Sequence, residues 1–264
     1  MYVLDVAAPS GGDPAAVVDA LRDRFADEGA VAVVRRDPTL GDADGAHTTV
    51  RLGGGRRRTT ADSRASLTAV LDDLARDHDF ALTVGFADAA LPRLAVGDAS
   101  VADPLARVTE AATLDPDSVL AALRETEPHE SLSSLVAAAK RSADERFAGA
   151  IATFTGRVRA QENADDAPTE ALSFETYAEV AAARLDDIRA ALEAREGVHD
   201  VLLHHRTGRI EASEDIVFVV VLAGHRREAF RAVEDGIDRL KDEVPIFKKE
   251  VTIDEEFWRH ERDA

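Results

Sequence analysis

The sequence contains no cysteine among its 264 residues. A chain without thiols cannot hold a disulfide framework, a thiolate zinc site or an iron–sulfur cluster, and it has no thiol nucleophile. Any sulfur chemistry would therefore need sulfur that a partner delivers. Carboxylates and histidines do not cluster in a metal-ligand pattern, so we expect no metal and no cofactor.

Lysine is almost as scarce, since only Lys140, Lys241, Lys248 and Lys249 are lysine among 32 basic residues. With abundant Asp and Ala, this composition resembles that of halophilic proteins, whose acidic surfaces keep them hydrated at high salt. Three of the four lysines lie within residues 241–249. If the bias in composition has replaced lysine by arginine at every position where arginine can do the same work, the remaining lysines mark positions that need a primary amine. Such an amine can lose its proton, whereas a guanidinium effectively cannot. Chance clustering is the alternative.

Basic residues are fewer than acidic residues in the whole sequence, and the net charge is −19. A protein that follows nucleic-acid phosphates needs a basic footprint, so we expect no nucleic-acid partner. The sequence lacks an uncharged stretch of about 18 residues, and no basic segment precedes an apolar run at its start. We therefore expect no membrane association and a soluble, cytoplasmic protein.

Residues 1–100 are predicted to form a parallel α/β domain in which strands and helices alternate. Asp13 and Pro14 are predicted to begin its first helix, as cap and first residue. The basic run from Gly53 to Arg58 is either a solvated hairpin tip or a loop that holds an anion through backbone amides. The buried strands are expected at residues 2–8, 30–34 and 80–86.

Residues 101–128 are predicted to be a linker with one or two short helices, because three acidic residues precede prolines here. Those pairs are Asp103-Pro104, Asp115-Pro116 and Glu127-Pro128. The second domain is then expected to cover residues 129–264. Its strands arrive in pairs between helices, which favours an α+β architecture.

Two His-Arg pairs in the second domain are candidates for anion binding. His225 and Arg226 lie where an apolar strand leads into a helix, whose first turn presents unpaired N–H groups and a partial positive charge. His205 and Arg206 form a second pair, at a turn. In both places the alternative is an ordinary surface residue.

Lys241 lies one turn after Ile237 and next to Leu240, so its stem is predicted to follow the buried stripe of a helix. Reduced hydration there would favour a titratable amine for acid–base or nucleophilic work. A snorkelling lysine with its ammonium in water is the alternative. Lys248 and Lys249 point to opposite faces of a strand, so only one of them can share a pocket with Lys241.

The second domain resembles the MoaE family, the large catalytic subunits of molybdopterin synthase, over residues 130–262. Phe247 stands where the family usually has Trp, and Phe174 where Tyr is common. The motifs that carry the resemblance are Gly156-Arg157-Val158-Arg159 with Asn163, Leu172 to Tyr177, His205 to Gly208, Ala223 to Arg226 with Phe230, and Leu240-Lys241 through Val244 to Glu250 and Trp258.

The resemblance implies an α/β hammerhead fold and transfer of sulfur to cyclic pyranopterin monophosphate, which forms the molybdopterin dithiolene. It implies Lys241 and Lys248 as catalytic residues, and Arg159, His225 and Arg226 as the pocket for the substrate phosphate. Arg262 matches an arginine that the family lends across its dimer. The implied partner is a ubiquitin-like small subunit with a C-terminal Gly-Gly thiocarboxylate, bound to a homodimer within a heterotetramer.

In the first domain, a strand leads through Ala8 to Ala15 into a helix, and Ala81 to Phe86 is followed by Leu91-Pro92-Arg93. With these motifs the domain is similar to the MobB family of P-loop proteins. A working phosphate loop needs Lys for the phosphates and Ser or Thr for Mg²⁺, but Pro14 and Ala15 occupy those places. Val84 stands where an acidic residue is expected. We therefore predict a degenerate domain that serves docking or channelling.

The sequence is also compatible with two other functions. In the first, the chain is an adaptor that recruits cofactor-maturation proteins through its first domain. A pure adaptor would not need the set of Arg159, His225, Lys241 and Lys248. In the second, the chain is a P-loop nucleotidase, which Pro14 and Ala15 oppose.

Overall fold

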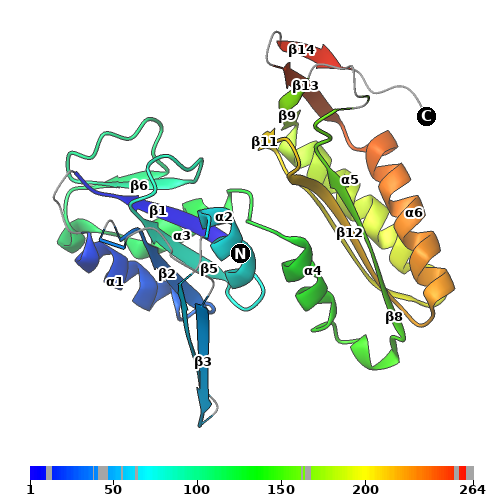
Figure 1. Ribbon diagram of the computed structural model, residues 1–264, viewed down its shortest axis with the longest axis horizontal. Coiled ribbons are helices and arrows are strands. Elements are labelled where there is room, and N and C mark those ends of the chain that lie inside the picture. The colour runs from blue at the N-terminus through cyan, green and yellow to red at the C-terminus, as the bar shows by residue number, and fades with distance from the viewer. Residues whose placement is uncertain are drawn as a thin grey trace. The chain divides into compact units, whose positions relative to one another are not determined.

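The computed structural model describes residues 1–9, 14–37, 39–40, 47–54, 56–62, 65–161, 163, 168–252 and 256–259. The chain divides into two compact units, Met1–Glu130 and Ser131–Ala264, and each has its own hydrophobic core (Figure 1). Among the described residues, no helix combines the length and the apolar character that a membrane span requires.

The first unit is built on a parallel sheet of five strands, which confirms the predicted α/β architecture. Its strands lie in the order β2-β5-β1-β6-β7, and each pairs in parallel with its neighbours. Central β1 is buried along its middle four residues, as expected for a strand covered on both faces. The strands are β1 (Tyr2–Ala7), β2 (Val31–Arg35), β5 (Phe80–Val84), β6 (Arg93–Val96) and β7 (Ala106–Val108).

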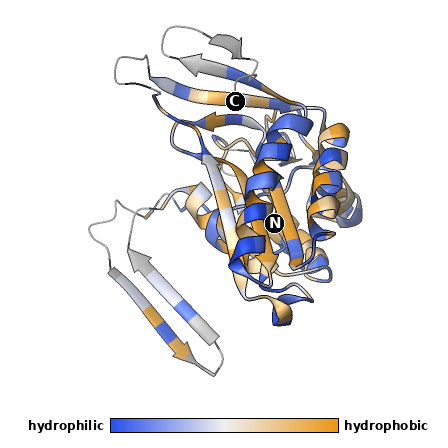
Figure 2. Cartoon of the chain, turned by 90° about the vertical axis from the view of Figure 1, so that its right-hand side faces the viewer, coloured by the Kyte–Doolittle hydropathy of each residue, from blue (hydrophilic) through white to orange (hydrophobic). Residues whose placement is uncertain are grey.

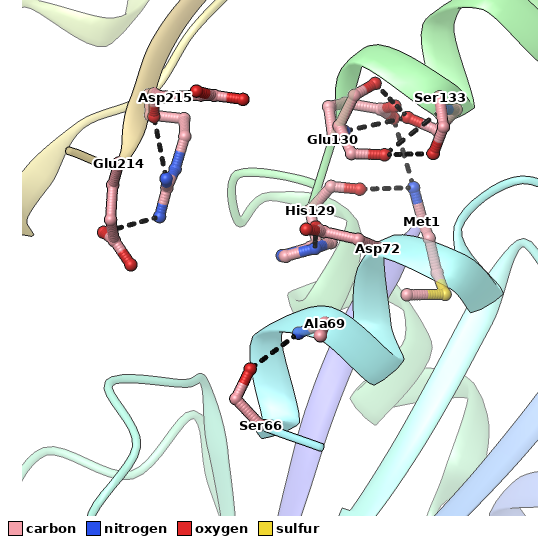
Figure 3. Close-up of polar contacts among 12 residues, drawn as sticks. Met1, Ser66, Ala69, Asp72, His129, Glu130, Ser133, Glu214 and Asp215 are labelled. Atoms are coloured by element: carbon pink, nitrogen blue, oxygen red, sulfur yellow. Dashed lines mark hydrogen bonds and ion pairs between the residues drawn. The ribbon is translucent and has the colours of Figure 1, made fainter. Parts of the chain in front are cut away.

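Helix α1 (Ala15–Phe25) packs on this sheet through the apolar face that the periodicity predicts, with Leu21 and Phe25 fully buried. It begins one residue later than expected, because Pro14 takes the capping position. The predicted cap, Asp13, lies outside the described residues. Helix α2 (Leu67–Leu74) is capped by the Ser66 hydroxyl, which accepts from the Ala69 N–H at 3.1 Å (Figure 3).

The basic run of the first half forms a hairpin, in which β3 (His47–Gly53) pairs antiparallel with β4 (Arg56–Asp62). Leu52 is 78% exposed, and hydrophobic and hydrophilic residues alternate along the hairpin in Figure 2. Gly55, at its tip, lies outside the described residues. The hairpin that we considered from the sequence is therefore confirmed.

The segment predicted to be a linker, residues 101–128, is instead part of the first unit. It contributes β7 to the sheet and contains the short η1 (Ala111–Thr113) and the helix α3 (Pro116–Arg124). Asp115 caps α3 by accepting from the Ser118 N–H, and Pro116 occupies the first turn. The acidic-proline pair therefore starts a helix here. Three side chains of α3 are buried in the core, namely Val119, Leu120 and Leu123. The burial of each stabilises the fold by about 1.5–3 kcal/mol, and this holds the helix on the sheet.

The first unit ends just beyond the predicted start of the second domain. The His129 ring lies 2.7 Å from Asp72 Oδ1, and the Met1 ammonium donates to the His129 carbonyl at 3.2 Å (Figure 3). Ser131 then caps α4 (Leu132–Ala139), the first helix of the second unit.

The second unit has the predicted α+β architecture and contains two antiparallel sheets among its described residues. One has the order β10-β12-β8, and the other has the order β11-β9-β13-β14. Their strands are β8 (Ala150–Arg157), β10 (Val198–His205) and β12 (Asp215–Ala223), then β9 (Thr169–Thr176), β11 (Gly208–Glu211), β13 (Ile246–Thr252) and β14 (Glu256–Arg259). The remaining elements are η2 (Glu145–Phe147), α5 (Ala178–Glu193) and α6 (Arg226–Glu243).

Strand β12 is buried on both faces because helices cover both sides of its sheet (Figure 1). α5 and α6 pack on one face and α4 on the other. Gly236 lets α6 approach closely, since a Cβ there would lie 3.2 Å from Val219 Cγ1. α6 is thereby fixed along the whole sheet, and this determines where its two ends lie.

Candidate active site

The His225 end of the second unit, which we define by His225 and Arg226, lies at the start of α6. β12 ends at Ala223, Gly224 makes the turn, and His225 takes the capping position without a side-chain cap bond. Both side chains are exposed. The first turn of a long helix with two such side chains favours a bound anion. The anion site at His225 and Arg226 stays a prediction.

Lys241 lies in the last turn of the same helix, and the structure corrects the expected burial of its stem. Ile237 and Leu240 are buried against the sheet, but Lys241 is exposed. Helical periodicity places Lys241 near the buried stripe, but no element of the described chain covers it there. Lys241 is therefore open to solvent in the single chain.

Lys248 lies on β13, and the pairing register of β13 with β9 determines the face of the sheet to which Lys248 belongs. It is directly opposite Phe174 of β9, whereas Lys249 is opposite Ser173. Directly opposed residues of antiparallel strands share a face, so Lys248 is on the face of buried Phe174 and Lys249 on the other. The two lysines thus point to opposite faces, as predicted.

Arg159 follows β8 and is held beside the turn that precedes β12. The Val158 N–H donates to the Glu214 carbonyl at 2.9 Å, and the Ser213 N–H donates to the Val158 carbonyl at 2.8 Å. Val158 is buried in a small core with Phe174, and Ile246 at the start of β13 packs against the same core. Arg159 therefore lies at the same end of the unit as Lys248 and the last turn of α6.

We call this region the lysine end of the second unit and define it by Arg159, Lys241 and Lys248. The topology places these three predicted residues at the same end of the unit, and it places His225 and Arg226 at the other end of α6. From Arg226 to Lys241 the helix rises about 22 Å, at roughly 1.5 Å per residue. One chain alone therefore does not assemble the predicted phosphate pocket of Arg159, His225 and Arg226. Arg262 lies outside the described residues.

His205, which the sequence offered with Arg206 as a candidate for anion binding, lies at the lysine end, where its ring packs on Phe174. Its ring meets the ring of Phe174 edge-on, with 5.0 Å between centroids. Burial lowers the pKa of His205 to about 4, and a hydrogen bond with the Arg206 backbone offsets this only in part. Arg206 donates to the Asp215 carbonyl at 2.8 Å and lies 3.8 Å from Glu214 (Figure 3). The second His-Arg pair was the sequence signal for this residue.

Comparison with known protein families identifies one matching region. The family described as MoaE protein matches residues 126–243. A probable molybdopterin synthase from Haloferax volcanii is 55% identical over 196 residues, which cover 74% of this chain and 75% of that protein. A molybdopterin synthase catalytic subunit from Pyrococcus abyssi is 42% identical over 110 residues, which cover 42% of this chain and 73% of that protein.

Solved structures give partial matches. The MoaE protein from Burkholderia ambifaria is 36% identical with a TM-score of 0.42, and the match covers 50% of this chain and 86% of that chain. A MobB protein homologue from Bacillus stearothermophilus is 16% identical with a TM-score of 0.38, and the match covers 48% of this chain and all of that chain.

The buried imidazole of His205 predicts a pH dependence of stability. Its pKa is about 4 in the folded chain and 6.5 in the unfolded chain, so the unfolded chain binds more protons between these values. As pH falls from 6.5 to 4, His205 therefore reduces the free energy of unfolding by about 3 kcal/mol. Denaturant unfolding at fixed salt should show a weaker loss over this window in His205→Phe. Equal losses in both proteins would contradict the assignment.

Proposed function

Since this chain belongs to the MoaE family of molybdopterin synthase catalytic subunits and acts as an enzyme of molybdenum cofactor biosynthesis, we propose that it transfers sulfur to cyclic pyranopterin monophosphate. The sulfur comes from the C-terminal Gly-Gly thiocarboxylate of a ubiquitin-like small subunit. One observation carries this proposal: the topology places two of only four lysines at the same end of the second unit as Arg159. The absence of cysteine agrees with an external sulfur donor.

The lysine end supplies amines and fixed positive charge for this reaction. As the thiocarboxylate sulfur adds to the side chain of the pterin, Lys241 and Lys248 assist the attack and the proton transfers. Arg159 adds a cation that cannot lose its proton. Positioning and charge stabilisation by these fixed groups supply most of the rate.

The substrate phosphate is held by His225 and Arg226, at the start of α6. Two side chains that each reach about 6–7 Å cannot bridge the roughly 22 Å along α6 to a common group. We therefore propose a homodimer in which each site combines the lysine end of one chain with the His225 end of its partner. With two small subunits this gives a heterotetramer, and Arg262 joins the site across the dimer.

Lys241→Arg tests the need for an amine. The variant keeps the positive charge on an exposed position, so the fold should persist, but a guanidinium cannot exchange its proton at neutral pH. We expect turnover to fall by about a hundredfold or more, as for loss of an acid–base group. The measurement mixes the chain with a thiocarboxylated carrier and cyclic pyranopterin monophosphate, and follows molybdopterin as its fluorescent oxidation product.

Lys140→Arg is the matched control, because Lys140 caps the end of α4, away from the lysine end, and is exposed. Its turnover should equal that of the unmodified chain. Substantial activity in Lys241→Arg would contradict the role of the amine. A folded wild-type chain that binds the carrier without forming product would favour the adaptor function.

The first unit is proposed to dock or channel without hydrolysing nucleotide. Pro14 caps α1 and Ala15 begins it, where a phosphate loop would supply Lys and Ser or Thr. The buried Asp5 carboxylate of β1 accepts from Thr83 Oγ1 at 2.8 Å and lies 3.4 Å from Arg93 Nε. This carboxylate is therefore already engaged and is not available to a nucleotide-bound Mg²⁺.

The full chain is accordingly expected to show no Mg²⁺-dependent GTP binding at micromolar concentrations. Equilibrium dialysis with labelled GTP, with and without Mg²⁺, measures this directly, and a working P-loop GTPase serves as the positive control. Tight binding that requires Mg²⁺ would overturn the docking proposal for the first unit.

A further inference from the structure

His205 lies where the two sheets of the second unit meet. It is the last residue of β10 and is directly opposite Val217 of β12 in one sheet. Its ring packs edge-on against Phe174, which belongs to β9 of the other sheet. This contact joins the two sheets at the lysine end.

Phe174 connects His205 to Lys248, because it neighbours both residues. In the cross-strand row of this sheet, Phe174 stands between Gly208 of β11 and Lys248 of β13. Gly208 has no side chain, and a Cβ there would meet nothing within 4 Å. Gly208 therefore adds no side-chain contact to Phe174 in this row, although Phe174 also packs with Ile210 of β11 in a buried cluster. The His205 ring is a further contact of Phe174, and Lys248 is the cross-strand neighbour of Phe174 on β13.

A purely structural role does not account for a histidine at this position. Its Nδ1 is buried and makes no hydrogen bond of good geometry among the described residues, so the contact with the Arg206 backbone is the ring's weak polar interaction. A buried polar atom without a partner costs free energy, and a phenylalanine of similar shape would fill the space without that cost. Sites where a sequence departs from the most stable choice are often functional.

We propose that His205 is a positioning residue for sulfur transfer, whose ring fixes Phe174 and thereby the place of the Lys248 ammonium beside the bound pterin. This inference rests on the proposed function. Only the neutral imidazole suits the role, because a second cation would repel Lys248. The charged group next to it in the chain is Arg206, which is held by Glu214 and the Asp215 carbonyl. The burial of the ring keeps it neutral.

The test compares His205→Phe with His204→Phe in the reconstituted assay with the thiocarboxylated carrier. His204 precedes His205 on β10 and faces the other side of the sheet, where it stacks on Phe218 at 6.3 Å. We expect kcat of His205→Phe to fall about ten- to a hundredfold, because small displacements of a reacting group are costly. KM for cyclic pyranopterin monophosphate should stay within about twofold, since the phosphate is held elsewhere. His204→Phe should keep both constants.

Two further measurements separate positioning from loss of structure. His205→Phe should unfold at the same temperature as the wild-type chain or higher, and its kcat should keep the same pH profile from pH 5.5 to 9. Wild-type kcat in His205→Phe, or an equal loss in His204→Phe, would overturn the proposal. So would the disappearance of a wild-type inflection between pH 6 and 7, because it would show that His205 titrates during catalysis.

If His205→Phe does not fold, the variant His205→Gln tests the positioning role instead. Glutamine is neutral and polar but presents no ring to Phe174, so kcat should fall as in the phenylalanine variant. A folded His205→Gln with wild-type kcat would overturn the proposal. If the wild-type chain itself forms no product, the proposed function fails, and this result is distinct from any effect of the His205 variants.

Discussion

The unbroken helix α6 is the constraint on which the site depends. Its 18 residues, Arg226–Glu243, connect the end of β12 to the start of β13 and are fixed on the sheet by a buried apolar stripe. The helix holds an exposed His-Arg pair at one end and Lys241 at the other, about 22 Å apart. The residues that we propose for phosphate binding and for sulfur transfer are thereby separated within one chain. A second chain is the direct way to bring the two functions to one substrate.

The amino-acid composition of the chain limits the chemistry that the proposed site can perform. Without cysteine, the protein has no thiol of its own to carry sulfur, which agrees with the proposed external donor. In a chain with a net charge of −19, three of the residues that we propose for sulfur transfer, Lys241, Lys248 and Arg159, are cations. Under the proposed function, these cations would stabilise an anionic thiocarboxylate that approaches a phosphorylated substrate.

Sequence patterns predicted the elements well but did not predict which of them cover one another. Strand and helix periodicity gave the parallel sheet of the first unit and the paired strands of the second. Asp115-Pro116 was misread because the same dipeptide breaks a chain and begins a helix. Lys241 was expected to be buried because periodicity gives a side chain's direction but not its cover. The contact between His205 and Phe174 joins residues of two sheets, and no local pattern contains it.

The central claim is that each site combines two chains, and co-expressing two differently tagged variants tests it most directly. Arg226→Ala and Lys241→Ala each remove one half of the site and should be inactive alone. Mixed dimers should regain about a quarter of wild-type turnover, since half of the dimers are mixed and each has one intact site. Lys241→Ala with Lys248→Ala is the control and should regain none, because both residues belong to the same half. Absence of recovery in the first pair, with mixed dimers isolated, would contradict the account.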